Sequence, residues 1–150
     1  MSATAFRPMS ENIRQSVFRQ MLMREAGPGA DASVVAAAAL RLCERVARRL
    51  VPLIGESGVI AICDRGLYLA QRRVPGLTPA RAPEADDGPF TRAHLFIEHQ
   101  EPALVSEAAV ALLTTVSELL ASFIGDSLTT HLLREALSDD FDGETTEETT

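Results

Sequence analysis

The sequence has no tryptophan, one tyrosine, two cysteines and no lysine, so its 14 basic side chains are all arginine. Two cysteines are too few for the disulfide framework that holds small secreted domains together. Few large aromatic side chains and few alternating β-branched runs are present, which disfavours a β-sheet fold and favours an all-α bundle. The exclusive use of arginine is typical of GC-rich bacterial genomes.

The net charge of −7 is spread unevenly along the chain. Residues 32–73 carry seven arginines and three acids, whereas residues 139–150 carry six acids and no base. An acidic total disfavours nucleic acid as the main partner, because contacts to phosphate need a cationic surface. No early apolar stretch resembles a signal peptide, and no uncharged apolar run approaches ~18 residues. We therefore expect a cytoplasmic protein that does not bind a membrane.

A short turn sequence occurs twice, as Ile-Gly-Glu-Ser at 54–57 and Ile-Gly-Asp-Ser at 124–127. Aligning 35–67 with 105–137 without a gap extends the match in both directions. The shared residues before each turn follow the three- and four-residue spacing of one helix face, while the charged positions between them differ. The identical pairs are Val35/Val105, Ala38/Ala108, Ala39/Ala109, Leu42/Leu112, Val46/Val116, Leu50/Leu120, Ile54/Ile124, Gly55/Gly125, Ser57/Ser127 and Leu67/Leu137.

This pattern predicts two copies of one helix–turn–helix unit, at about 32–73 and 103–138, whose shared apolar faces pack together. Chance similarity of two helices rich in alanine and leucine is the alternative. Together with an N-terminal helix, the two units make a predicted all-α helical bundle. We expect a single domain (1–137) followed by a disordered acidic tail (138–150). The domain consists of the N-terminal helix (10–26, capped by Ser10), repeat one (32–73), a proline-rich linker (75–89) and repeat two (102–137).

Four residues of the repeated turn are predicted to be structural. Gly55 and Gly125 would each end a helix in the left-handed conformation, which glycine adopts without a Cβ clash. Ser57 and Ser127, or the acid before each, would accept a hydrogen bond from the N–H groups that open the next helix.

Four arginines, Arg41, Arg45, Arg48 and Arg49, have the spacing of one face of the first long helix, opposite the shared apolar stripe. This face could bind an acidic protein surface, a phosphate group or the chain's own acidic tail. The alternative is a solvated helix face on which Glu44 pairs with Arg48.

The second helix of repeat one is apolar around much of its circumference. Part of it, with Leu67 and Tyr68 as candidate contacts, is therefore expected to touch a second chain or the N-terminal helix. Gly66 lies inside this helix, where the missing side chain could permit a close approach by another helix. The N-terminal helix itself would either cover the bundle or exchange with a neighbouring subunit.

The histidines do not form a recognisable metal or catalytic site. His94 and His99 are five residues apart, which does not place two imidazoles on one helix face, and no third ligand is evident. His131 on the last helix could carry a phosphoryl group, although nothing around it specifies that chemistry. No known catalytic motif is present. We therefore expect no enzyme activity, catalytic residue, metal or cofactor.

The segments LVPLIGESGVIAICDRGLYLAQRRVPGL and LLASFIGDSLTTHLLREAL resemble small bacterial all-helical proteins of unassigned activity. Those proteins have a LIGERG-like turn and an RSLHLA-like helix. The resemblance covers about 46–77 and 117–137. Residues 65–70 (RGLYLA) fit the second motif, whereas Gly58-Val59 replaces the Gly-Phe pair of the first. The resemblance implies a helical fold and brings no activity with it.

Three functions remain open at this point. The first is a non-enzymatic protein–protein interaction module, a homodimer that serves as a regulatory or adaptor subunit in bacterial signalling. The second is a helical sensor that binds a small molecule between the repeats, near the glycine turns. The third is a phosphotransfer protein that uses His131, or a metal-dependent enzyme that uses His94 and His99.

Overall fold

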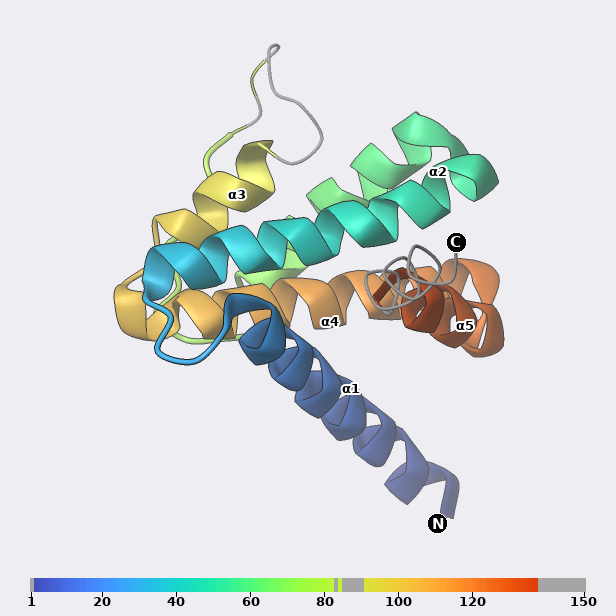
Figure 1. The fold of residues 1–150 in the computed structure, drawn as a ribbon. Coiled ribbons are helices and arrows are strands. Elements are labelled where there is room, and N and C mark those ends of the chain that lie inside the picture. Colours follow the sequence, from blue (N-terminus) through green and yellow to red (C-terminus); the bar gives the residue numbers. More distant parts are fainter. Residues whose placement is uncertain (1, 83, 85–90, 138–150) are drawn as a thin grey trace, which may run out of the picture.

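In a computed structural model of the chain, residues 2–82, 84 and 91–137 are described, and for residues 2–12 only the backbone path. Within these ranges the fold is all-helical, as predicted (Figure 1). The predicted acidic tail (138–150) and part of the predicted linker lie outside the described residues. The elements are α1 (Ser2–Ala26), α2 (Ala32–Ala70), α3 (Thr91–Glu98), the short 3-10 helix η1 (Pro102–Leu104), α4 (Val105–Ile124) and α5 (Asp126–Leu137).

Helix α2 consists of two helices joined at Gly55, whose backbone leaves the helical region with φ 80° and ψ 166°. Its second half turns back along the first (Figure 1). Gly125 has nearly the same conformation between α4 and α5, with φ 92° and ψ 156°. The predicted breaks are therefore found at both glycines. Both glycines have the predicted positive φ, but their ψ values differ from the value near +47° of a left-handed helix and belong to a region occupied essentially by glycine alone.

The predicted capping role of Ser127 is also wrong. Helix α5 begins at Asp126, directly after Gly125, and the Gly125 carbonyl oxygen accepts the Thr129 N–H at 3.1 Å. Ser127 thus lies inside the first turn, whereas a capping side chain acts from the residue before the helix. The predicted capping role of Ser57 is wrong for the same reason. Gly55 is the only residue inside the described helix α2 with non-helical backbone angles, so Ser57 lies in the first turn after the bend.

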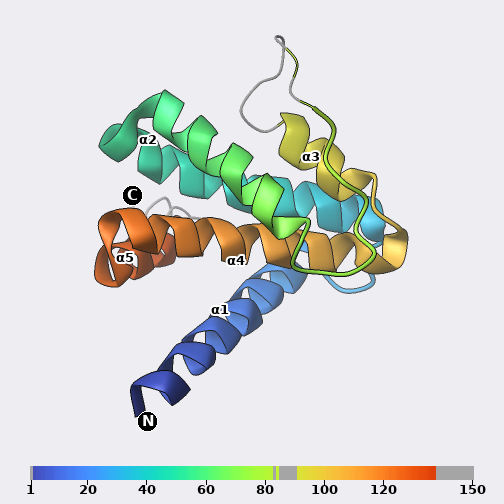
Figure 2. The same ribbon diagram turned by 180° about the vertical axis from the view of Figure 1, so that it is seen from behind.

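Helix α2 lies along α4, and the shared apolar stripe forms the centre of the fold (Figures 1 and 2). Ala38, Ala39, Ala108 and Ala109 have no exposed surface. Such small side chains allow two helix backbones to approach closely. The second half of α2 also comes close to α4, because a Cβ added at Gly66 would lie 2.8 Å from Val116 Cγ2. The predicted close approach at Gly66 is therefore confirmed.

Helix α1 is longer than predicted, because it starts at Ser2 and not at Ser10. Proline removes one N–H donor, but its fixed φ suits a helix, and α1 continues through Pro8. Phe18 and Leu22 are buried against α2 and α4, so the second half of α1 covers the bundle. The first half runs away from the body of the molecule (Figures 1 and 2).

Two glutamines hold the described part of the predicted linker against the helices. The Gln100 side chain accepts the Thr78 N–H at 2.7 Å and donates to the Thr78 carbonyl oxygen at 2.9 Å. The Gln71 side chain accepts the Ala80 N–H at 2.8 Å. Gln100 is itself buried, so its amide replaces water as the partner of this backbone segment.

Candidate interaction surface

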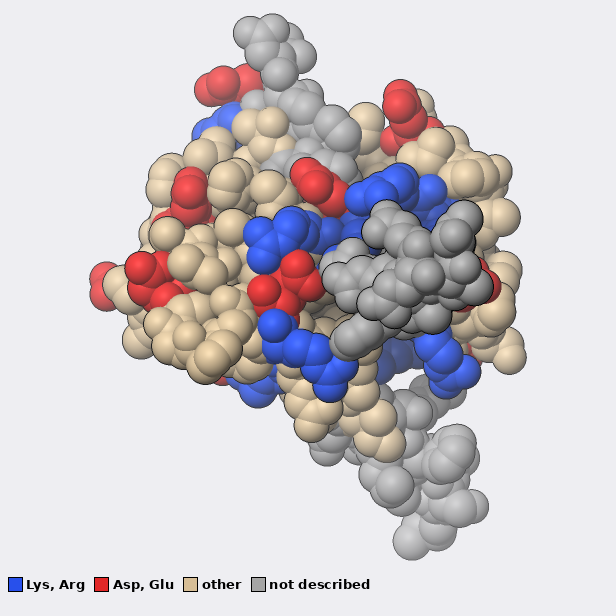
Figure 3. Space-filling view, viewed as in Figure 1, with Lys and Arg blue, Asp and Glu red and all other residues tan. Residues whose placement is uncertain are grey.

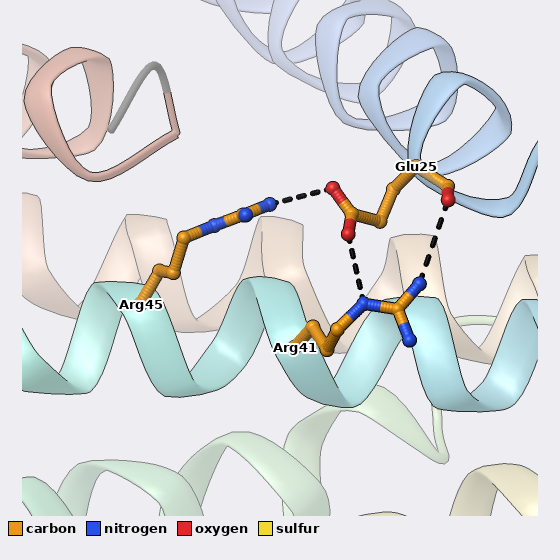
Figure 4. A network of polar contacts seen from close by, with 3 residues as sticks. All are labelled: Glu25, Arg41 and Arg45. Atoms are coloured by element: carbon orange, nitrogen blue, oxygen red, sulfur yellow. Dashed lines mark hydrogen bonds and ion pairs between the residues drawn. The ribbon is translucent and has the colours of Figure 1, made fainter. Parts of the chain in front are cut away.

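The predicted arginine row is divided between the interior and the surface. Arg45 is only 7% exposed, and its Nη2 donates to Glu25 Oε1 at 2.7 Å. Arg41 Nε donates to the other carboxylate oxygen, Oε2, at 2.8 Å (Figure 4). Arg49 forms an ion pair with Glu135 of α5, with 3.7 Å between Nη1 and Oε1. Two of the four arginines therefore bind α1 and one binds α5, so the four do not form one surface that faces a partner.

The Glu25 carboxylate is the acceptor that Arg41 and Arg45 share. Burial alone would raise its pKa, but the hydrogen bonds and positive charges of Arg41 and Arg45 outweigh that effect and hold the pKa below its ordinary value. Arg45 contacts Glu25 across helices, so its predicted role in partner binding is wrong. Arg45 lies opposite the apolar stripe of α2, but α1, a helix outside the repeat, covers it.

Leu67 and Tyr68, the other two predicted contacts, are also divided between the interior and the surface. Leu67 is buried in the core and is not available to a partner, which corrects the prediction for this residue. Tyr68 is 49% exposed, and the guanidinium carbons of Arg65 and Arg72 lie 5.7 Å and 5.4 Å from its ring centre. Arg72 Nη1 also donates to the Tyr68 hydroxyl at 3.0 Å. The exposed part of this helix thus contains an aromatic ring with two cations close to it.

Exposed apolar side chains gather at the two glycine bends, and the sequence interpretation did not single them out. Leu53 is 53% exposed and Phe123 is 73% exposed. The gapless alignment pairs these two residues, each directly before an Ile-Gly dipeptide. Val51 and Leu128 are also exposed, within a few residues of the two bends in the sequence. Both bends lie at the same end of the molecule (Figures 1 and 2).

The middle of α1 is linked to the same end of the molecule by an ion pair. Arg14 Nη2 lies 3.0 Å from Asp126 Oδ1, and Asp126 follows Gly125 directly. On α1, Ile13 and Val17 are exposed and one helical turn apart. Two apolar side chains of α1 therefore lie beside an ion pair that reaches a bend. We use the name bend surface for the exposed residues Ile13, Val17, Val51, Leu53, Phe123 and Leu128.

A cavity of about 30 Å³ lies between the two halves of α2 and α4, and its exposed lining is apolar. This volume is of the order of one water molecule, too small for a metabolite. Cys43 and Cys63 both line it. Burial raises the pKa of the Cys43 thiol to about 12 and that of Cys63 to about 11, so both thiols are protonated at neutral pH.

Each histidine with a described side-chain partner is paired with a glutamate one turn away. His94 Nε2 lies 3.4 Å from Glu98 Oε2, and His131 Nε2 lies 3.2 Å from Glu135 Oε2. In the described part of the chain, no three His, Cys, Asp or Glu side chains are grouped so that they could hold a metal ion.

No protein-family profile, curated protein or solved structure matches the chain. In the described ranges, one helical stretch, Pro102–Ile124, is long and apolar enough to cross a membrane. However, 61% of its apolar window is buried inside the fold, as in the core helix of a bundle.

Proposed function

We propose that the protein is a non-enzymatic helical interaction module that pairs with a second copy of itself through the bend surface. Such a module would act as a regulatory or adaptor subunit in bacterial signalling. The exposure of Phe123 is the observation that carries the proposal, because a phenylalanine ring left 73% exposed gains most from being covered. The other five apolar side chains of the bend surface extend the area that a partner would cover.

The charges around the bend surface favour a second copy as the partner. Arg14 lies on one side of it, and the exposed acids Asp126 and Glu56 lie at the two bends. In a two-fold dimer the same patch meets itself, so the cation of one copy can approach an acid of the other. The equivalent positions of Leu53 and Phe123 are consistent with our interpretation that a helix–bend–helix unit was duplicated, because each unit would contribute one exposed apolar edge.

Sedimentation velocity over a range of protein concentrations tests the proposal. We expect the parent chain to sediment as a dimer and the double variant Leu53→Ser/Phe123→Ser as a monomer. Val34→Ser is the matched control, because Val34 is also exposed (40%) but lies in the first turn of α2. The intervening helix places it roughly 30 Å from the Gly55 bend. A monomeric parent chain, or a dimer that the double variant weakens no more than Val34→Ser does, would refute the proposal.

The two other functions stay predictions with less support. A sensor would need space between the units for its ligand, and the cavity there has the size of a water molecule. Phosphotransfer through His131 would need an exposed imidazole, and His131 is exposed next to Glu135. Phosphorylation that is the same in His131→Ala as in the parent chain would count against it.

A further inference from the structure

Three of the predicted arginines remain at the surface after Arg45 is assigned to the interior, although two of them also hold a glutamate of a neighbouring helix. Arg41 and Arg48 are exposed and Arg49 is half-buried, all on the first half of α2. We call these three residues the arginine face. They span about 12 Å of helix. Figure 3 shows basic side chains gathered on the side of the molecule where α1, α2 and α5 meet. Glu25 and Glu135 occupy only part of the donors of Arg41 and Arg49, because a guanidinium has five N–H groups, so an acidic segment can add further ion pairs on this face.

The described chain ends beside this face. Glu135, near the end of α5, forms the ion pair with Arg49, and Leu137 packs against the core. Leu137, the last described residue, therefore lies only two positions after the ion-pair partner of Arg49. The residues that follow, 139–150, have six acids and no base.

We propose that residues 139–150 bind the arginine face of the same chain. A thirteen-residue segment starting at 138 can extend up to ~40 Å, so it can reach Arg41 as well as Arg49. Attachment through a short tether gives a local concentration on the order of millimolar, so several weak ion pairs suffice to hold the segment. Guanidinium groups are suited to this role because they can bind a carboxylate through two parallel hydrogen bonds.

This proposal is independent of the proposed dimer, because the arginine face and the bend surface share no residue. Its consequence is that an acidic segment of another protein would have to displace the chain's own acids. The interaction should weaken in salt, since exposed charges are screened beyond ~8 Å at physiological ionic strength.

A paramagnetic probe on Thr150→Cys tests the proposal in the full-length chain. The native thiols are protonated and partly buried, so a maleimide reagent at neutral pH should label the new cysteine first, which mass spectrometry verifies. We expect the probe to broaden the backbone amide NMR signals of residues 41–49 more strongly than those of residues 65–72. The second segment is the internal control, because Arg65 and Arg72 are also exposed cations. Equal broadening at both segments, or none, would overturn the proposal.

Charge variants identify the cause of the broadening. We expect at least a twofold loss of broadening in Arg48→Gln/Arg49→Gln and little change in Arg65→Gln/Arg72→Gln, which removes the same charge. Addition of 0.5 M NaCl should act like the first variant. An unchanged signal in Arg48→Gln/Arg49→Gln, with native circular dichroism, would contradict the proposal.

A mixed sample separates binding within one chain from binding between copies. It combines isotope-labelled chains without the probe and unlabelled chains with it. We expect no broadening of residues 41–49 in this sample, because the proposed contact is within one chain. Broadening there would show that the acidic residues bind a second copy, and it would overturn the proposal whether or not the bend surface forms a dimer.

Discussion

At the scale of single residues, Glu25 has the largest predicted effect on stability. Its side chain is 19% exposed and accepts hydrogen bonds from Arg41 and Arg45, so Glu25→Gln should lower the free energy of unfolding at pH 7 by roughly 1.5–3 kcal/mol. Because the pKa of Glu25 is lowered in the folded state, this stabilisation is complete above the ordinary pKa near 4.5 and is lost as the pH falls through the folded value.

Urea unfolding between pH 3 and pH 7 measures this effect. The parent chain should lose stability relative to Glu25→Gln as the pH falls below about 4.5, so that the two curves converge. Glu107→Gln is the control, because the Arg19–Glu107 ion pair is about 40% exposed at both side chains and should contribute only about 0–1 kcal/mol. A difference between parent and Glu25→Gln that does not change with pH would show that the charge of Glu25 is not responsible.

At the scale of elements, the two bends depend on glycine and not on serine. Both glycines have positive φ, and nothing lies within 4 Å of a Cβ added at either position, so the cost of a side chain is backbone strain alone. Gly55→Ala and Gly125→Ala should each lower the free energy of unfolding by about 1–3 kcal/mol. Ser57→Ala and Ser127→Ala should change it by less than about 0.5 kcal/mol, since both serines lie exposed inside a helical turn. Chemical denaturation decides the question, and a larger loss from the serine variants would restore the capping role that the sequence suggested.

The elements also show which features the sequence could predict. The helical class, the breaks at both glycines and the contact at Gly66 follow from local signals: the spacing of apolar residues, the turn residues and a missing side chain. The burial of Arg45 did not follow, because its partner Glu25 lies on a helix outside the repeat. Leu53 and Phe123 were overlooked because their side chains fall outside the shared stripe. Whether such a residue is covered depends on the arrangement of all helices, which periodicity in one helix does not specify.

At the scale of the whole molecule, self-association through the bend surface would link stability to concentration. A dimer that dissociates on unfolding is stabilised by mass action, so its midpoint of thermal unfolding should rise as the protein concentration rises. We expect this rise in the parent chain and in Val34→Ser, and no rise in Leu53→Ser/Phe123→Ser. Circular dichroism melts at concentrations a hundredfold apart would measure it. A parent melting point that is independent of concentration would argue that the bend surface serves something other than a second copy.

The placement of Tyr68 close to two guanidinium groups has a practical consequence. The chain has one tyrosine and no tryptophan, so its ultraviolet emission comes from this single ring, on the second half of α2. The ring's emission should respond when a neighbouring cation is drawn away or when water is displaced from its exposed side. The protein thus carries an intrinsic fluorophore that reports on one defined patch of its exterior, without any added dye.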